Sequence, residues 1–219
     1  IADYLGDGNI DSFVAQMNQK AKDLGAANTH FVNAHGLYDP QQVTTAKDMY
    51  LIAKYALTLP IFSKICNTST YLMPTTSYHP NGNWYIQQTN KLLVKGHADY
   101  YEYAFGVKTG TLDEVGRNLV STASNNGYNY MLVTLGAPIY DSDGNTYPNN
   151  LAFEDARNLY DWAFSSFSLQ TVLKENEVIG EIDVALSAGQ DYARLIAGED
   201  VTALLPKDSD SSVIQRNIT

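Results

Sequence analysis

Apolar residues near the start of the chain recur every three or four positions, which is the spacing of an amphipathic helix. Residues 11–26, DSFVAQMNQKAKDLGA, show this spacing at Phe13, Met17, Ala21 and Leu24. Asp11 or Ser12 is expected to cap the helix at its start, and Gly25 suits its C-terminal end. The segment is therefore predicted to be a helix that packs through one face.

Two further helices are predicted from the same spacing. One begins at Thr44 or Thr45. Thr45 and Asp48 resemble a capping box at that point, and Pro60 is expected to stop the helix. The other helix is predicted over residues 151–167, and its common apolar side consists of Phe153, Ala156, Leu159, Tyr160 and Ala163.

Three segments between these helices have the character of strands. They cover residues 104–111, 118–124 and 128–135. Asn126-Gly127 separates the last two and supplies the residue types of a tight two-residue hairpin. The sequence therefore predicts an antiparallel meander of three strands.

The pattern of apolar and polar residues changes near the end of the chain. From residue 171 onward, short alternating runs are interrupted by Gly and Pro, which is typical of a small β-rich module. The fold class is therefore expected to be α+β, an antiparallel sheet flanked by helices and followed by a small β-rich C-terminal module. The predicted domains are residues 1–168 and 172–219.

Composition narrows the classes of function. The chain has 24 acidic and 14 basic residues, and no cluster of Lys and Arg that could neutralise successive phosphates. Nucleic acid is therefore not an expected partner. No run of apolar residues is long enough to cross a bilayer.

Residues that often carry metal or thiol chemistry have simpler interpretations here. Cys66 is the single cysteine, so no internal disulfide can form, and it follows an apolar helical stretch where a buried structural thiol is expected. His30, His35, His79 and His97 lack the spacing of a zinc site, and no metal site is predicted. The run from Asp141 to Asn145 resembles part of a calcium loop, but a solvent-exposed turn is the favoured interpretation.

The tripeptide Lys108-Thr109-Gly110 lies on the first strand of the meander. A lysine ammonium and a threonine hydroxyl suit a carboxylate, and a glycine allows another backbone to approach closely. Taken alone, the tripeptide favours a solvated strand lysine before a turn.

The surrounding sequence gives the tripeptide a context. VKTGTLDEVGRNLVSTA, at residues 107–123, resembles the low-molecular-mass penicillin-binding proteins, which are serine D-alanyl-D-alanine carboxypeptidases of peptidase S11 type. Further similar blocks occur in the expected order, and these are NTHFVNAHGLYD, TTAKDMYLIAKYAL, QTNKLL, EDARNLYDWAF and GEDVTALLPKDSD. The resemblance implies that residues 1–168 are the C-terminal portion of the catalytic domain, and that 172–219 begin a β-rich C-terminal domain.

The resemblance also implies roles for individual residues. Lys108, Thr109 and Gly110 would bind the terminal carboxylate of a substrate or of a penicillin. Thr111 would be catalytic through its backbone N–H, which would form one side of an oxyanion hole. The sequence departs from the family at two positions, because Leu112 replaces a common small polar residue and Ala152 stands where an arginine is usual.

The nucleophile of the family is not in this chain. No lysine has a serine three residues before it, so Ser-x-x-Lys is absent. Ser124-Asn125-Asn126 has the form of the second motif, but it follows Lys108 instead of preceding it and is interpreted as part of a hairpin. Both motifs are expected upstream of Ile1, and the isolated chain is expected to be catalytically inactive.

The implied partners are a peptidoglycan stem peptide ending in D-Ala-D-Ala, β-lactam antibiotics and an N-terminal segment of the same protein. No cofactor is implied, and the expected location is outside the cytoplasmic membrane of a bacterium. An alternative hypothesis is a non-catalytic module that binds the cell wall or a protein partner through the same strand edge. A β-lactamase is disfavoured because such enzymes normally end with their last helix.

Overall fold

The structure is a computed structural model that describes residues 1–82, 84–185 and 188–210. The chain forms two compact units, Ile1–Tyr160 and Asp161–Thr219, and the division falls within one helix. Each unit is described separately below.

The first unit is built on a three-stranded antiparallel sheet in the order β3-β4-β5. Its strands are β3 (Ala104–Leu112), β4 (Gly116–Asn125) and β5 (Tyr128–Ala137). Asn126 and Gly127 both adopt positive φ, 51° and 85°, as a tight hairpin between twisted strands requires. The predicted meander is confirmed, with each strand one to three residues longer than its predicted range.

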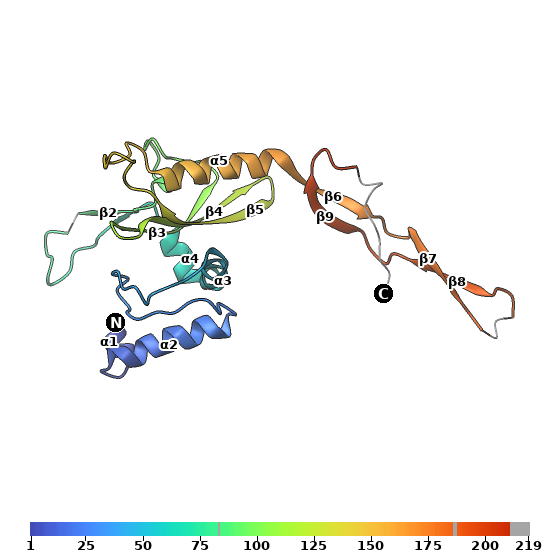
Figure 1. Ribbon diagram of the computed structural model, residues 1–219, viewed down its shortest axis with the longest axis horizontal. Helices are drawn as coiled ribbons and strands as arrows, with labels where there is room; N and C mark the ends of the chain where they lie inside the picture. Colours follow the sequence, from blue (N-terminus) through green and yellow to red (C-terminus); the bar gives the residue numbers. More distant parts are fainter. Residues whose placement is uncertain (83, 186–187, 211–219) are drawn as a thin grey trace. The chain divides into compact units, whose positions relative to one another are not determined.

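Helices lie on both faces of this sheet (Figure 1). The helices α3 (Ala46–Leu57) and α4 (Pro60–Cys66) cover one face, and the first part of α5 (Leu151–Ser166) covers the other. The core between sheet and helices includes buried Ala53, Cys66, Val107 and Val120, with Met49, Leu57, Phe62, Met131 and Val133 packed against them. The sheet is therefore held from two sides, as the predicted α+β class requires.

Helix capping corrects one prediction and supports another. The predicted first helix is α2 (Ile10–Asp23), preceded by a short α1 (Ala2–Leu5). Its cap is Asn9, whose side chain accepts from the N–H groups of Asp11 and Ser12, so neither of those two residues is the cap. In α3, Thr45 is the cap as predicted and accepts from the N–H of Asp48.

The face of α5 also differs from the prediction at one position. Ala152, Phe153, Ala156 and Tyr160 are buried, whereas Leu159 is 44% exposed. The buried face of α5 therefore includes Ala152 and does not include Leu159. The Tyr160 hydroxyl lies 2.8 Å from Ser121 Oγ on β4, and this buried pair joins helix to sheet.

Smaller elements complete the first unit. The strands β1 (Thr70–Leu72) and β2 (Tyr85–Gln87) pair antiparallel, and the 3-10 helix η1 (Lys91–Leu93) follows β2. Within the described residues no single helix has the length and apolar character to cross a membrane, although α3 and α4, bent by 110°, meet that test when counted together.

The second unit contains the end of α5 and two antiparallel strand pairs. In one pair β6 (Phe167–Leu173) lies beside β9 (Val201–Pro206), and in the other β7 (Val178–Asp183) lies beside β8 (Tyr192–Ile196). The predicted β-rich character of this part of the chain is confirmed.

Candidate functional site

The first half of strand β3 is shaped by packing against α4. The N–H of Gly106 donates to Asn67 Oδ1 at 2.8 Å, and a Cβ on Gly106 would overlap the backbone carbonyl of Cys66. Val107, which comes next, is buried. Glycine at position 106 is therefore explained by the close approach of helix and strand.

The second half of β3, Lys108 to Leu112, is not shaped in this way. Lys108 and Gly110 are exposed and Thr109 is half-buried. A Cβ on Gly110 would meet only Asn118 Cβ at 3.9 Å, an ordinary contact distance, and its φ is not positive. The fold therefore gives no reason for glycine at position 110.

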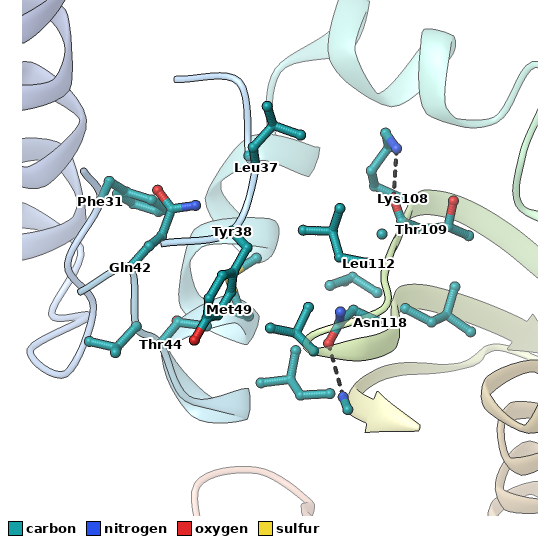
Figure 2. Close-up of a pocket in the computed structure, with 18 of the residues that line it drawn as sticks. Phe31, Leu37, Tyr38, Gln42, Thr44, Met49, Lys108, Thr109, Leu112 and Asn118 are labelled. Atoms are coloured by element: carbon teal, nitrogen blue, oxygen red, sulfur yellow. Dashed lines mark hydrogen bonds between the residues drawn. The ribbon is translucent and has the colours of Figure 1, made fainter. Parts of the chain in front are cut away.

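Two adjoining cavities, of about 540 and 780 Å³, share this half of the strand. Figure 2 shows the first of them, with Leu37, Tyr38 and Gln42 on one side facing Lys108, Thr109, Leu112 and Asn118 on the other. Thr89, Lys91, Thr111 and Phe153 are among the residues that line the second cavity. Both volumes lie within the range of small-molecule sites.

The ammonium group of Lys108 donates to the backbone carbonyl of Thr109 at 2.7 Å (Figure 2). Its charge also acts on Cys66, since burial raises the pKa of the Cys66 thiol and the positive charge of Lys108 opposes that rise. A thiol with a raised pKa is a weak nucleophile at neutral pH. The predicted structural, buried role of Cys66 fits these observations.

Thr109 has a partner that the sequence did not indicate. Its Oγ1 lies 2.7 Å from Oγ1 of Thr89, and either atom can be the donor. Thr89 belongs to the segment QTNKLL, which resembles the family, but no role was assigned to it from the sequence. The contact joins residues 20 positions apart in the chain.

The loop that faces Lys108 is held in place by a buried carboxylate. Asp48 Oδ2 accepts from the N–H of Asn28 at 2.7 Å and from Thr29 Oγ1 at 2.9 Å. Burial opposes ionisation of Asp48, but the hydrogen bonds from Thr29, Asn28 and Thr45 outweigh it and hold the pKa of this carboxyl below its usual value. Asp48 thereby fixes the start of the loop that supplies one wall of the first cavity.

The remaining candidate residues take the following positions. Thr111 pairs with Arg117 across the β3–β4 ladder, and Leu112 lines both cavities. Ala152 is buried, so no side chain from that position reaches the site. Arg157 donates to the carbonyl of Ala98 at 2.9 Å.

Two further predictions concern segments away from these cavities. Ser124 and Asn125 end β4 beside the Asn126 turn, which confirms that Ser124-Asn125-Asn126 is part of a hairpin. Asp141 Oδ1 accepts from the N–H groups of Asp143 and Asn145 and so closes its own turn. Over the described part of the chain, no group of three or more His, Cys, Asp or Glu is placed to hold a metal ion.

Comparison with known proteins identifies the family of this chain. The family model of D-alanyl-D-alanine carboxypeptidases, peptidase S11, matches residues 1–139. The carboxypeptidase DacF of Bacillus subtilis is 27% identical over 219 residues, which are 100% of this chain and 51% of that protein. DacC of Escherichia coli is 31% identical over 175 residues, 80% of this chain and 38% of that protein.

Solved structures agree with the sequence comparison. Penicillin-binding protein 5 of Haemophilus influenzae is 27% identical, with a TM-score of 0.64 over 96% of this chain and 55% of that one. The Streptomyces K15 DD-transpeptidase is 26% identical, with a TM-score of 0.59 over 72% of this chain and 56% of that one. The chain spans about half the length of the curated relatives it matches. The family model covers residues 1–139, which are well over half of the chain. The chain therefore belongs to the D-alanyl-D-alanine carboxypeptidase family.

Proposed function

We propose that this chain supplies the carboxylate-binding half of a serine D-alanyl-D-alanine carboxypeptidase that acts on peptidoglycan stem peptides. The observation that carries the proposal is the second half of β3. It combines an exposed lysine, a threonine hydroxyl and a glycine that the packing of the chain does not require. A peptide ending in a carboxylate needs these groups, because it brings a negative charge and a backbone to the same strand edge.

Lys108 and Thr109 bind the terminal carboxylate of the substrate in this proposal. The ammonium supplies a compact positive charge, and the hydroxyl donates a hydrogen bond to one carboxylate oxygen. Gly110 leaves room for the backbone of the last residue. The same three residues bind the carboxylate of a β-lactam.

The covalent chemistry needs groups that this chain does not contain. A serine attacks the carbonyl between the two D-alanines, a lysine accepts its proton, and D-alanine leaves with a proton. Water then hydrolyses the acyl-enzyme. Since the chain has no Ser-x-x-Lys, we place the serine and its lysine on another segment of the full-length protein.

That segment is proposed to pack into the apolar cavity beside Lys108, which is lined by side chains such as Phe31, Tyr38, Met49 and Leu112. Thr111 then gives one backbone N–H to the oxyanion hole and the serine gives the other. Loss of a single donor costs about 10²- to 10³-fold in rate, and loss of the serine also removes the covalent route, so the chain without that serine is expected to be inactive.

The family likeness suggests the setting of the protein as well. Residues 172–219 would begin a β-rich C-terminal domain that follows the catalytic domain. The full-length protein would act in the bacterial cell wall, outside the cytoplasmic membrane.

Release of D-alanine from a peptide ending in D-Ala-D-Ala tests the proposal. The full-length protein is expected to release it, the 219-residue chain alone is not, and Lys108→Met in the full-length protein is expected to lower kcat/KM by about 10²-fold. Release by the chain alone, or full activity of Lys108→Met, would contradict it. Binding of the peptide without any release by the full-length protein would favour the non-catalytic module instead.

A further inference from the structure

We propose that Thr89 is a positioning residue that aims the hydroxyl proton of Thr109 at the substrate carboxylate. The inference rests on the proposed function and extends it to a residue outside the Lys108-Thr109-Gly110 tripeptide. The two hydroxyl oxygens are 2.7 Å apart, and both threonines line the larger cavity beside β3.

The direction of the hydrogen bond follows from the chemistry of the ligand. An ionised carboxylate can only accept hydrogen bonds, so the Thr109 hydroxyl must donate its single proton to it. That proton is then not available for Thr89. The bond must therefore run from the Thr89 hydroxyl to the Thr109 oxygen, and Thr89 fixes where the Thr109 proton points. A donated hydrogen bond also polarises the Thr109 hydroxyl and strengthens the bond that it donates in turn.

The backbone on both sides of Thr89 is anchored, which gives its hydroxyl a defined position. Before it, the N–H of Gln88 donates to the carbonyl of Ser69 at 2.8 Å, and the Gln88 side chain donates to the carbonyl of Cys66 at 3.2 Å. After it, Asn90 and Leu92 are fully buried, and Asn90 Oδ1 accepts from the N–H of Leu92. A hydroxyl held in this way is suited to orienting a neighbour.

Three cationic side chains other than Lys108 that come from the segments around β3 each donate to an acceptor of the chain. The ammonium of Lys91, which lines the same cavity, donates to Gln87 Oε1 at 3.0 Å and to the carbonyl of Gln88 at 3.3 Å. Arg117 and Arg157 donate to the carbonyls of Asn149 and Ala98. Ala152 is buried where an arginine is usual. The proposed contacts to the carboxylate are therefore the Lys108 ammonium and the Thr109 hydroxyl, and Thr89 orients the latter.

The test uses the full-length protein and two matched ester substrates. One is acyl-D-Ala-D-lactate. The other is acyl-D-Ala ethyl ester, in which a hydrogen atom replaces the carboxylate of the lactate. Thr89→Val is expected to lower kcat/KM for the lactate ester by about 3- to 12-fold, within the range for a hydrogen bond between two neutral groups. It is expected to change kcat/KM for the ethyl ester by less than about twofold. Thr89→Ser, which keeps the hydroxyl, is expected to restore the wild-type value.

Thr122→Val is the matched control. Thr122 also donates its hydroxyl to β3, to the carbonyl of Gly106 at 3.3 Å, but it has no contact with Thr109. It is expected to affect the two esters equally. Equal losses on both esters for Thr89→Val, or no loss on either, would overturn the role of Thr89 while leaving the proposed function intact. Failure of the unmodified full-length protein to cleave either ester would overturn the proposed function, and this inference with it.

Discussion

The two halves of strand β3 contain one glycine each, and the two glycines have different explanations. At Gly106 the chain itself fills the space that a side chain would need, because the carbonyl of Cys66 lies against the strand. At Gly110 the space is open and the backbone is ordinary. The difference teaches that the packing of the chain requires glycine in the first half of the strand and does not require it in the second half, where the substrate is proposed to bind.

The largest expected effect separates the two glycines by stability. Gly106→Ala should lower the free energy of unfolding by about 3 kcal/mol, because the new methyl group must displace backbone atoms of α4. Gly110→Ala should change it by less than about 0.5 kcal/mol. Urea denaturation of the chain measures both values. Equal losses at the two positions would break the comparison.

Gly110, which matters little for stability, should matter for activity. In the full-length protein, Gly110→Ala is expected to lower kcat/KM for release of D-alanine by about 10²-fold, because a Cβ displaces the substrate backbone from the strand edge. The folded fraction, followed by circular dichroism, should stay unchanged. Wild-type kcat/KM in Gly110→Ala would mean that nothing binds close to this position.

A smaller effect concerns the packing that fixes the strand from the side of α5. Tyr160→Phe removes one partner of the buried pair with Ser121 and should lower the free energy of unfolding by about 1 to 2 kcal/mol. Ser121→Ala in the same background should recover part of this loss, because it removes the unpaired hydroxyl. No recovery in the double variant would contradict the pairing.

Tyr160 is also expected to make the stability of the fold depend on pH. Burial raises the pKa of the Tyr160 hydroxyl, although hydrogen bonds from Ser121 and Leu132 oppose this. The neutral form is favoured in the fold, so its stabilisation is complete below pH of about 10 and is lost as pH rises above the pKa of an unfolded tyrosine. Thermal melts of the wild type and of Tyr160→Phe should therefore converge above pH 10. Parallel curves would contradict this assignment.

The smallest effect is expected in the loop that faces Lys108. The pKa of Asp48 is held low, so its stabilising contribution is present above pH of about 4 and is lost as pH falls through the lowered pKa. Asp48→Asn should flatten the pH dependence of the melting temperature between about pH 5 and pH 3. An unchanged acid limb in this variant would show that Asp48 does not hold the loop.

Local signals explain which parts of the fold were predictable. Asn126-Gly127 predicts the hairpin because few other residue pairs adopt positive φ at both positions, and Thr45 predicts the start of α3. The start of α2 was misplaced, since Asn9, Asp11 and Ser12 are all good capping residues within four positions. The buried face of α5 was wrong at Leu159, because spacing alone cannot tell which edge of a stripe meets the sheet.

The candidate site was predictable only where it is contiguous in the sequence. Lys108, Thr109 and Gly110 stand next to one another and match a family pattern. Thr89 and the loop held by Asp48 reach them through contacts between distant segments, which no local spacing encodes. The different roles of Gly106 and Gly110 likewise depend on the position of Cys66, and so required coordinates.

The measurement that tests the central claim most directly is intact-mass spectrometry before and after incubation with benzylpenicillin. The 219-residue chain should show no increase in mass, and the full-length protein should gain one penicillin, at a rate that Gly110→Ala and Lys108→Met both reduce. An increase in the mass of the chain alone would show that one of its own serines is the nucleophile. Acylation of the full-length protein at an unchanged rate in both variants would show that the second half of β3 does not bind the ligand.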